Sequence, residues 1–267
     1  MGQEIEKTHI DCCTEFGYEL QLVIPYAYYL HTHGRLGSTQ SCLSTKEMYY
    51  FSPEHIEKYE LRQPNNPNTP NSTPHTTDFR YDQWIPPPYK DIYKNNLFVF
   101  PKPLLIIHNK YNIEWHQRPV NFLDIPTLDT LFQTLKAKYT IVYIRPASNL
   151  IVDDKASRIL GLREEAKLLR RNRIMTGEWL YEQNKGACAN FNHFQFMLHA
   201  NCNHFISVQG GNSVLASYFG GTNIIYAKGG NELWCNAYEN LYKRFSNCNV
   251  FNAQNYEDFL TLVRTHY

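Results

Sequence analysis

The sequence predicts an α/β fold in which helices cover both faces of a doubly wound parallel sheet. In the second half of the 267 residues, short strand-like runs alternate with longer segments of helical periodicity, which is typical of parallel sheets. A stretch rich in Pro and Asn at residues 63–77 interrupts the first half and predicts a mobile surface loop. We expect two α/β units, residues 1–120 and 121–267, with the active site in the cleft between them.

The first unit is expected to contain three strands, at residues 20–25, 97–100 and 104–107, because each is a short apolar run rich in strand-forming residues. A glycine-containing turn at residues 33–38 follows the first of these runs. The sequence WIPPPY at residues 84–89 predicts an extended aromatic segment.

The second unit begins with a helical pattern at Ile125, in which Leu128, Leu131, Phe132 and Leu135 fall on one face. The other elements expected there are strands at residues 140–144, 205–208, 223–226 and 249–251 and helices at residues 162–171, 191–200, 213–219 and 256–264. The last helix could pack back on the first unit.

Composition and charge exclude several classes of protein. A formal net charge of +1 offers no general attraction to nucleic acid or to an anionic membrane. No apolar run is long enough to span a bilayer, and the first residues are too polar for a signal peptide. The seven cysteines contain no CxxC pair, which indicates free thiols in a reducing compartment. We therefore expect a cytoplasmic protein with no nucleic-acid partner and no membrane insertion.

The most informative segment is FISVQGGNS at residues 205–213, where an apolar strand ends in small and polar residues and a helix follows at once. This arrangement directs backbone N–H groups and the helix dipole at the carboxyl edge of the sheet, where a diphosphate fits. The candidate contacts are Gln209, Gly210, Gly211, Asn212 and Ser213. The alternative is a tight strand-to-helix turn that binds no ligand.

Residues 205–232 resemble the nucleotide-binding half of inverting GT-B glycosyltransferases, especially the fucosyltransferase superfamily and related, xylosyltransferase-like enzymes of bacteria and large DNA viruses. The resemblance implies two Rossmann-like domains, with the acceptor on residues 1–120 and the nucleotide sugar on residues 121–267. It also implies transfer of a sugar, xylose or fucose by preference, from a UDP- or GDP-linked donor to a carbohydrate acceptor in glycan synthesis.

Two further motifs carry the resemblance. Gly34, Arg35, Leu36 and Gly37 are similar to the family's Gly-Arg-Leu/Phe-Gly-Asn loop, with Ser38 in place of Asn, and would approach the donor through backbone amides. Arg145 stands where the family's His-x-Arg-x-x-Asp motif has its phosphate-binding arginine, although Tyr143 and Ser148 replace the flanking His and Asp. These departures leave open which sugar the donor carries and which nucleotide base it has.

The chemistry of the transfer supports a cation at this position. Negative charge develops on the leaving diphosphate, so a fixed guanidinium stabilises the transition state more than the ground state. Arg145 is the first candidate and Arg35 the second. The chain has no Asp-x-Asp motif for Mg²⁺ or Mn²⁺, so we expect no metal and no cofactor. Glu232, after the strand at residues 223–226, is a candidate ligand of the ribose or the sugar.

Inversion at the sugar carbon also needs a base for the acceptor hydroxyl. The candidates are Asp78, Asp82, His33, His31 and Glu114. Asp78 is preferred because it follows the Pro-rich loop directly and Arg80 lies close enough to keep it ionised. Trp84 and Tyr89, just beyond it, would stack the sugar acceptor.

One other function remains open, and a third is disfavoured. A module that binds a nucleotide or a carbohydrate without catalysis would explain the incomplete His-x-Arg-x-x-Asp match. A Rossmann-type oxidoreductase is disfavoured, because no G-x-G-x-x-G motif follows the first expected strand.

Overall fold

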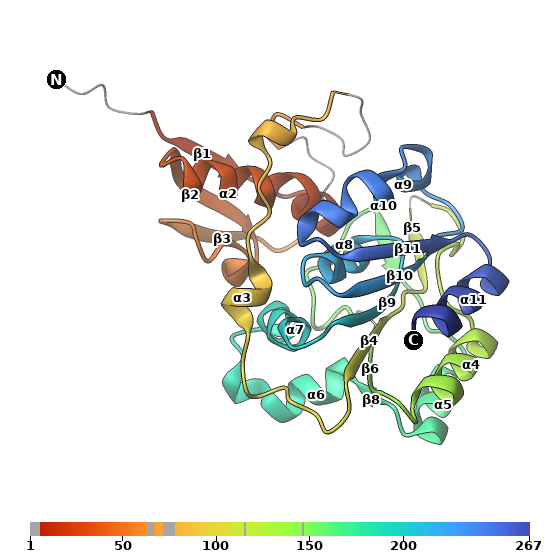
Figure 1. The fold of residues 1–267 in the computed structure, drawn as a ribbon. Coiled ribbons are helices and arrows are strands. Elements are labelled where there is room, and N and C mark those ends of the chain that lie inside the picture. The colour runs from red at the N-terminus through yellow and green to blue at the C-terminus, as the bar shows by residue number, and fades with distance from the viewer. Residues whose placement is uncertain (1–5, 64–66, 72–77, 115, 146) are drawn as a thin grey trace.

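A six-stranded parallel sheet forms the centre of the molecule (Figure 1). The computed structural model describes residues 6–63, 67–71, 78–114, 116–145 and 147–267, so most of the predicted Pro-rich loop lies outside the described residues. The strands are β4 (Leu104–His108), β6 (Thr140–Ile144), β8 (Met175–Thr176), β9 (His204–Val208), β10 (Thr222–Tyr226) and β11 (Asn249–Ala253). All neighbouring pairs are parallel, as the sequence predicts.

The order of these strands is β11-β10-β9-β4-β6-β8. The chain begins in the middle with β4, adds β6 and β8 on one side, and then crosses back to add β9, β10 and β11 on the other. This is the strand order of Rossmann-like folds, in which the crevice beside the first strand is the usual ligand site. Here that crevice lies between the carboxyl ends of β4 and β9.

Helices cover both faces of the large sheet. On β4, Leu105 and Ile107 face a core that includes residues of α4 (Ile125–Leu135), α5 (Glu165–Asn172) and α11 (Tyr256–His266). Leu104 and Ile106 face the opposite core, which includes residues of α6 (Gly177–Asn184), α7 (Phe191–Ala200), α8 (Gly211–Ser217) and α10 (Ala237–Asn240). Strands buried on both faces explain the continuous apolar runs of the second half.

A separate three-stranded parallel sheet lies beside the large one (Figure 1). Its strands are β1 (Thr8–Asp11), β2 (Leu36–Cys42) and β3 (His55–Tyr59). The chain then passes through η3 (Tyr81–Gln83) and α3 (Tyr89–Tyr93) to enter the large sheet at β4. Because β4 precedes residue 120 and pairs with β6 and β9, the change of sheet comes between β3 and β4. Two Rossmann-like domains of the GT-B type are therefore not confirmed. The last helix, α11, packs on the large sheet, against β10 and β11.

The strand predicted at residues 20–25 is wrong, because this segment is helical. It spans the π-helix η1 (Glu19–Val23) and the start of α2 (Ile24–Thr32), which continue from α1 (Phe16–Tyr18). All five residues of η1 are buried, and a short apolar run that is buried on every side cannot be distinguished from a strand by its pattern. The helix also explains Pro25, which lies in the first turn of α2, where its missing N–H is tolerated.

The strand predicted at residues 97–100 is also wrong. The backbone N–H groups of Leu97 and Phe98 donate to the side-chain oxygen of Asn95, at 3.0 and 3.1 Å. An asparagine that accepts from the residues following it forms a turn instead of a strand.

The remaining elements are short. They are β5 (Asn112–Glu114) paired antiparallel with β7 (Ser157–Ile159), α9 (Asn231–Trp234), and the 3-10 helices η2 (Lys46–Tyr49), η4 (Lys185–Ala187) and η5 (Tyr242–Phe245). Within the described ranges, no helix has both the length and the apolar character needed to cross a bilayer.

Candidate functional site

Two connected cavities lie where the carboxyl ends of the two sheets meet. The larger has a volume of about 510 Å³ and the smaller about 450 Å³. The segments after β1, β2 and β3 contribute Phe16, Leu43 and Leu61 to the larger cavity. The walls that both cavities share, here called the junction, are Glu15, Gly17, Lys110, Asn112, Glu114, Asp154, Ser157, Gln209, Gly210 and Gly211. The junction includes the crevice between β4 and β9, where Rossmann-like folds bind ligands.

Lys110 and the glycine pair meet at this crevice. The Lys110 ammonium donates to both carboxylate oxygens of Glu114 at 2.7 Å and lies 3.3 Å from the side-chain oxygen of Gln209. A Cβ on Gly210 would come within 3.0 Å of the Lys110 nitrogen, and Gly210 has a φ of +127°. Glycine is therefore needed for the backbone conformation and for the close approach of the cation.

The loop after β1 closes the junction from the small sheet. A Cβ on Gly17 would lie 3.3 Å from the Cα of Gly211, and a Cβ on Gly211 would lie 2.7 Å from a ring carbon of Phe16. Helix α1, after β1, and helix α8, after β9, thus touch through glycine backbones. This contact brings Glu15, which precedes Gly17, opposite the residues that follow β9.

Glu15 has an unusual protonation equilibrium. Burial, together with the nearby carboxylates Asp154, Glu114 and Glu232, raises its pKa from 4.5 to about 7, while Lys110 opposes the rise. Burial also raises the pKa of Asp154. A carboxyl group in a cavity with a pKa near neutrality can take up a proton and release it again, which is what general acid–base catalysis needs.

A polar network holds the wall of the smaller cavity. The Gln209 side chain donates to both oxygens of Glu232 at 2.9 and 3.0 Å and accepts from Asn121 at 2.9 Å. Asn121 also donates to the carbonyl of Gly229 and accepts from its N–H. The loop after β10 is thereby fixed to the loop after β9.

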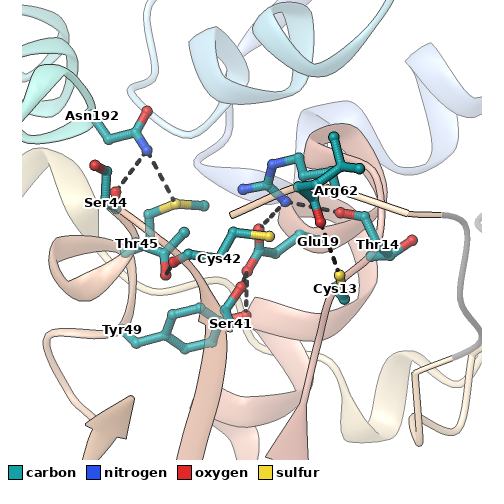
Figure 2. Close-up of polar contacts among 12 residues, drawn as sticks. Cys13, Thr14, Glu19, Ser41, Cys42, Ser44, Thr45, Tyr49, Arg62 and Asn192 are labelled. Carbon is teal, nitrogen blue, oxygen red and sulfur yellow. Dashed lines mark hydrogen bonds and ion pairs between the residues drawn. The ribbon is translucent and has the colours of Figure 1, made fainter. Parts of the chain in front are cut away.

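A buried ion pair supports the wall of the larger cavity (Figure 2). Arg62 donates to Glu19 at 2.6 Å and to the carbonyl of Thr14 at 2.9 Å. Glu19 also accepts from the hydroxyls of Ser41 and Tyr49. Arg62 is 4% exposed and Glu19 is fully buried, so the pair holds the start of η1 against the segment after β3 and fixes the position of the loop that carries Glu15.

Several residues predicted for the donor site do gather here. Gln209, Gly210, Gly211 and Asn212 line the larger cavity, and Glu232 lines the smaller one. Ser213 lies just behind them, buried, with its hydroxyl on the carbonyl of Gly210 at 2.7 Å. Of the residues considered as the base, Glu114 lies in the junction.

The predicted loop of Gly34, Arg35, Leu36 and Gly37 lies elsewhere. Gly34 and Arg35 precede β2, and Leu36 and Gly37 are its first two residues, so the segment stands at the amino edge of the small sheet, whereas the cavities lie at the carboxyl edge. Gly34 has a φ of +66°, and the N–H of Arg35 donates to the carbonyl of Leu30 at 2.8 Å. Gly34 and Arg35 therefore end helix α2, and Leu36 and Gly37 open β2. His33, in the same turn, is exposed and contacts the carbonyl of Tyr29 at 2.8 Å.

Arg145 also differs from its predicted role. Its guanidinium pairs with Glu165 at 2.9 Å and donates to the carbonyl of Leu160 at 2.7 Å. It is not among the described residues that line the two cavities. The arrangement makes Arg145 a structural tie between β6 and the segment that leads into α5.

The two rings predicted to stack on the sugar acceptor are buried, so this prediction is corrected. Tyr89 is fully buried and donates to the carbonyl of Met48, and Trp84 is 6% exposed and donates to the carbonyl of Gln21. Rings in the core cannot stack on a sugar. The two acids beside them are exposed and line neither cavity; Asp82 forms an ion pair with Arg80 at 2.9 Å, and Asp78 lies at the edge of the described residues.

Sequence reasoning missed Glu15, Lys110 and Asn121. Lys110 had a usable signal, because it follows the predicted strand at residues 104–107 and the carboxyl ends of parallel strands meet at one edge. Glu15 had none, since β1 is only four residues long and the carboxylates that raise its pKa are more than 95 positions away along the chain.

Comparison of the chain with models of protein families, with curated proteins and with solved structures found no match.

Proposed function

We propose that the protein transfers a sugar from a nucleotide-activated donor to a hydroxyl group of a carbohydrate acceptor, with inversion at the sugar carbon. The single observation that supports this most is Glu15, whose pKa is about 7, in the wall that the two cavities share and near the Lys110 ammonium. A transfer reaction needs two substrates that meet at one proton acceptor, and two connected cavities provide that arrangement.

The smaller cavity suits the donor. Among the described residues, its two cations are Lys110, which is paired with Glu114, and Arg118, and the backbone of two glycine turns, at residues 210–211 and 229–230, forms part of its wall. It is also lined by the carboxylates of Glu15, Glu114, Asp154 and Glu232. Glycine allows a diphosphate to come close to the backbone. Lys110 takes the role that the sequence assigned to Arg145, and this cation is the reason for proposing the transfer without a metal ion.

The larger cavity suits a carbohydrate acceptor. Its walls combine carboxylate and amide side chains, such as Asp153, Asn112 and Gln195, with the apolar surfaces of Phe16 and Phe191. Planar polar groups bind sugar hydroxyls, and apolar groups pack on the faces of sugar rings.

The proposed step moves one proton and one glycosyl group. The ionised carboxylate of Glu15 takes the proton of the acceptor hydroxyl while that oxygen bonds to the anomeric carbon. The bond from the anomeric carbon to the phosphate oxygen breaks, and its electron pair leaves with the nucleoside diphosphate. Lys110 stabilises the charge that develops on the phosphate, which lowers the barrier because this charge is absent from the ground state.

Calorimetric titration and turnover with nucleotide sugars test this function. UDP-xylose and GDP-fucose are the first donors to try, with UDP and GDP as the matched nucleotides, and liberated nucleotide diphosphate is the readout. We expect binding of one nucleotide class and release of its diphosphate. If none of the common nucleotide sugars binds, the proposal fails.

The second candidate is a module that binds a nucleotide or a carbohydrate and does not transfer it. It is favoured by one observation: the only arginine of the matched family motif, Arg145, is held by Glu165 outside the cavities. Binding without hydrolysis or transfer would identify this function.

A further inference from the structure

Gln21 has a buried polar atom that lacks a partner. Its side chain is 5% exposed and lines the smaller cavity. Among the described residues, nothing donates to its side-chain oxygen, and its side-chain nitrogen has only a long contact of 3.5 Å with the Tyr242 hydroxyl. Buried polar side-chain atoms are nearly always hydrogen-bonded, so this atom requires an explanation.

Reversing the amide does not remove the problem. If the oxygen and nitrogen of Gln21 exchange places, the Tyr242 hydroxyl can donate to the oxygen, but the nitrogen then lacks an acceptor. In both orientations one polar atom of the amide remains without a partner. The group that completes it must therefore be able to donate or to accept.

The backbone around Gln21 is firmly held. In the π-helix η1, the N–H of Ile24 bonds to the carbonyl of Glu19 instead of that of Leu20, and Pro25 has no N–H to donate to the carbonyl of Gln21. Tyr218 donates to the carbonyl of Leu20 at 2.6 Å and Trp84 to that of Gln21 at 2.7 Å. The side chain of Gln21 is thus presented to the cavity from a fixed position, and π-helical segments often occur at functional sites.

We propose that Gln21 binds a hydroxyl group of the transferred sugar and helps to select that sugar. This inference rests on the proposed function, in which the donor occupies the smaller cavity. Glu15, Tyr18 and Gln21 are spaced three residues apart, from the N-cap of α1 into η1, and all three line this cavity. Gln21 therefore lies on the same side of the cavity as Glu15, where the reacting sugar is placed. A hydroxyl both donates and accepts, so it completes the amide in either orientation.

The test replaces Gln21 by Met, which keeps the length of the side chain and removes its polar atoms. Without ligand, we expect Gln21→Met to be at least as stable to heat as the wild type, because the wild type buries an unpaired polar atom. Gln183→Met, at an exposed position of α6, controls for the change of residue type.

A binding experiment compares the affinity for UDP-xylose with that for UDP, and the affinity for GDP-fucose with that for GDP. In the wild type, the sugar should increase affinity over the nucleotide alone. In Gln21→Met that increment should fall by about tenfold, while the affinity for the nucleotide stays the same. A deoxy sugar that lacks the bound hydroxyl should show the same loss with the wild type and no further loss with the variant.

Two outcomes would overturn the inference. Lower stability of unliganded Gln21→Met would mean that the amide already has a structural partner, such as a resident water. If the gain in affinity from the sugar is the same in Gln21→Met as in the wild type, the sugar does not reach Gln21. If neither nucleotide binds at all, the proposed function fails, and the stability comparison alone then decides whether the amide of Gln21 is unpaired.

Discussion

In the proposed reaction, Glu15 sets the expected dependence of the rate on pH. Its ionised form is the base, so kcat/KM should rise with pH and level off above a pKa of about 7. Asp154 is one of the carboxylates that raise this pKa, so Asp154→Asn should move the rising limb to lower pH. Glu182→Gln, in an exposed ion pair with Lys185, should leave the limb in place. If the rising limb of the pH profile does not move in Asp154→Asn, the group that titrates in this profile is not Glu15.

The same residue makes a prediction about stability. The folded protein binds the proton of Glu15 more tightly than the unfolded chain, so the contribution of Glu15 to stability is largest below pH 4.5 and is lost as the pH rises through about 7. Glu15→Gln cannot ionise. Its free energy of unfolding should therefore exceed that of the wild type above neutrality and approach it in acid. Chemical denaturation at several pH values measures the difference, and a difference that is the same at all pH values would contradict the raised pKa.

Replacing Arg145 should reduce stability and leave catalysis nearly unchanged. Arg145→Ala leaves Glu165 and the carbonyl of Leu160 without their partner, and losing these charged hydrogen bonds should cost about 1.5–3 kcal/mol of unfolding free energy. Chemical denaturation gives the cost, and turnover corrected for the folded fraction should be close to that of the wild type. A large loss of turnover in a stable variant would restore the role that the sequence motif suggested.

Single residues were predictable where local pattern fixes position. Gln209, Gly210 and Gly211 follow an apolar strand and open a helix, and these neighbours along the chain determine where they lie. The positions of Tyr89 and Arg145 were not predictable. An aromatic ring can pack in a core as well as on a ligand, and a guanidinium can pair with a carboxylate of the protein as well as with a phosphate. Only the tertiary packing distinguishes these uses, as it does for the carboxylates around Glu15.

At the scale of elements, the contact between α1 and α8 holds the junction together. A methyl group on Gly211 would meet the ring of Phe16 at 2.7 Å, so Gly211→Ala should cost about 1–3 kcal/mol of stability by overpacking and reduce turnover by moving Glu15. Gly186→Ala is the matched control, since a Cβ there meets nothing within 4 Å. Thermal unfolding and turnover of both variants test the contact, and equal behaviour of the two would exclude it.

The expected elements hold well in the second half and poorly in the first. β6, β9, β10 and β11 and the helices α4, α5, α7, α8 and α11 were predicted, because strands buried on both faces and amphipathic helices each have a distinct pattern. The helices α6, α9 and α10 were not predicted. The π-helix at residues 19–23 is buried all round and so has no periodicity to detect. β1 was missed because four residues give too short a pattern.

At the scale of the whole molecule, the two sheets direct their carboxyl edges at the same pair of cavities. A nucleotide that binds there should protect backbone amides in both sheets' loops at once. Hydrogen exchange should slow at residues 12–18, 209–212 and 229–232, with no change at residues 33–37, and a ligand at 100 times its Kd should add ~2.7 kcal/mol of stability. Protection confined to one sheet would argue against a site between them.

The most direct test of the account is the turnover of Glu15→Gln with the nucleotide sugar that the wild type uses, measured at about pH 8, where the wild-type carboxylate is ionised. We predict a fall in kcat of about 10²–10⁴-fold, with donor affinity unchanged and with Glu182→Gln as active as the wild type. Turnover by Glu15→Gln equal to that of the wild type would contradict the assignment of Glu15 as the base and, with it, the proposal that the two cavities meet at a catalytic proton acceptor.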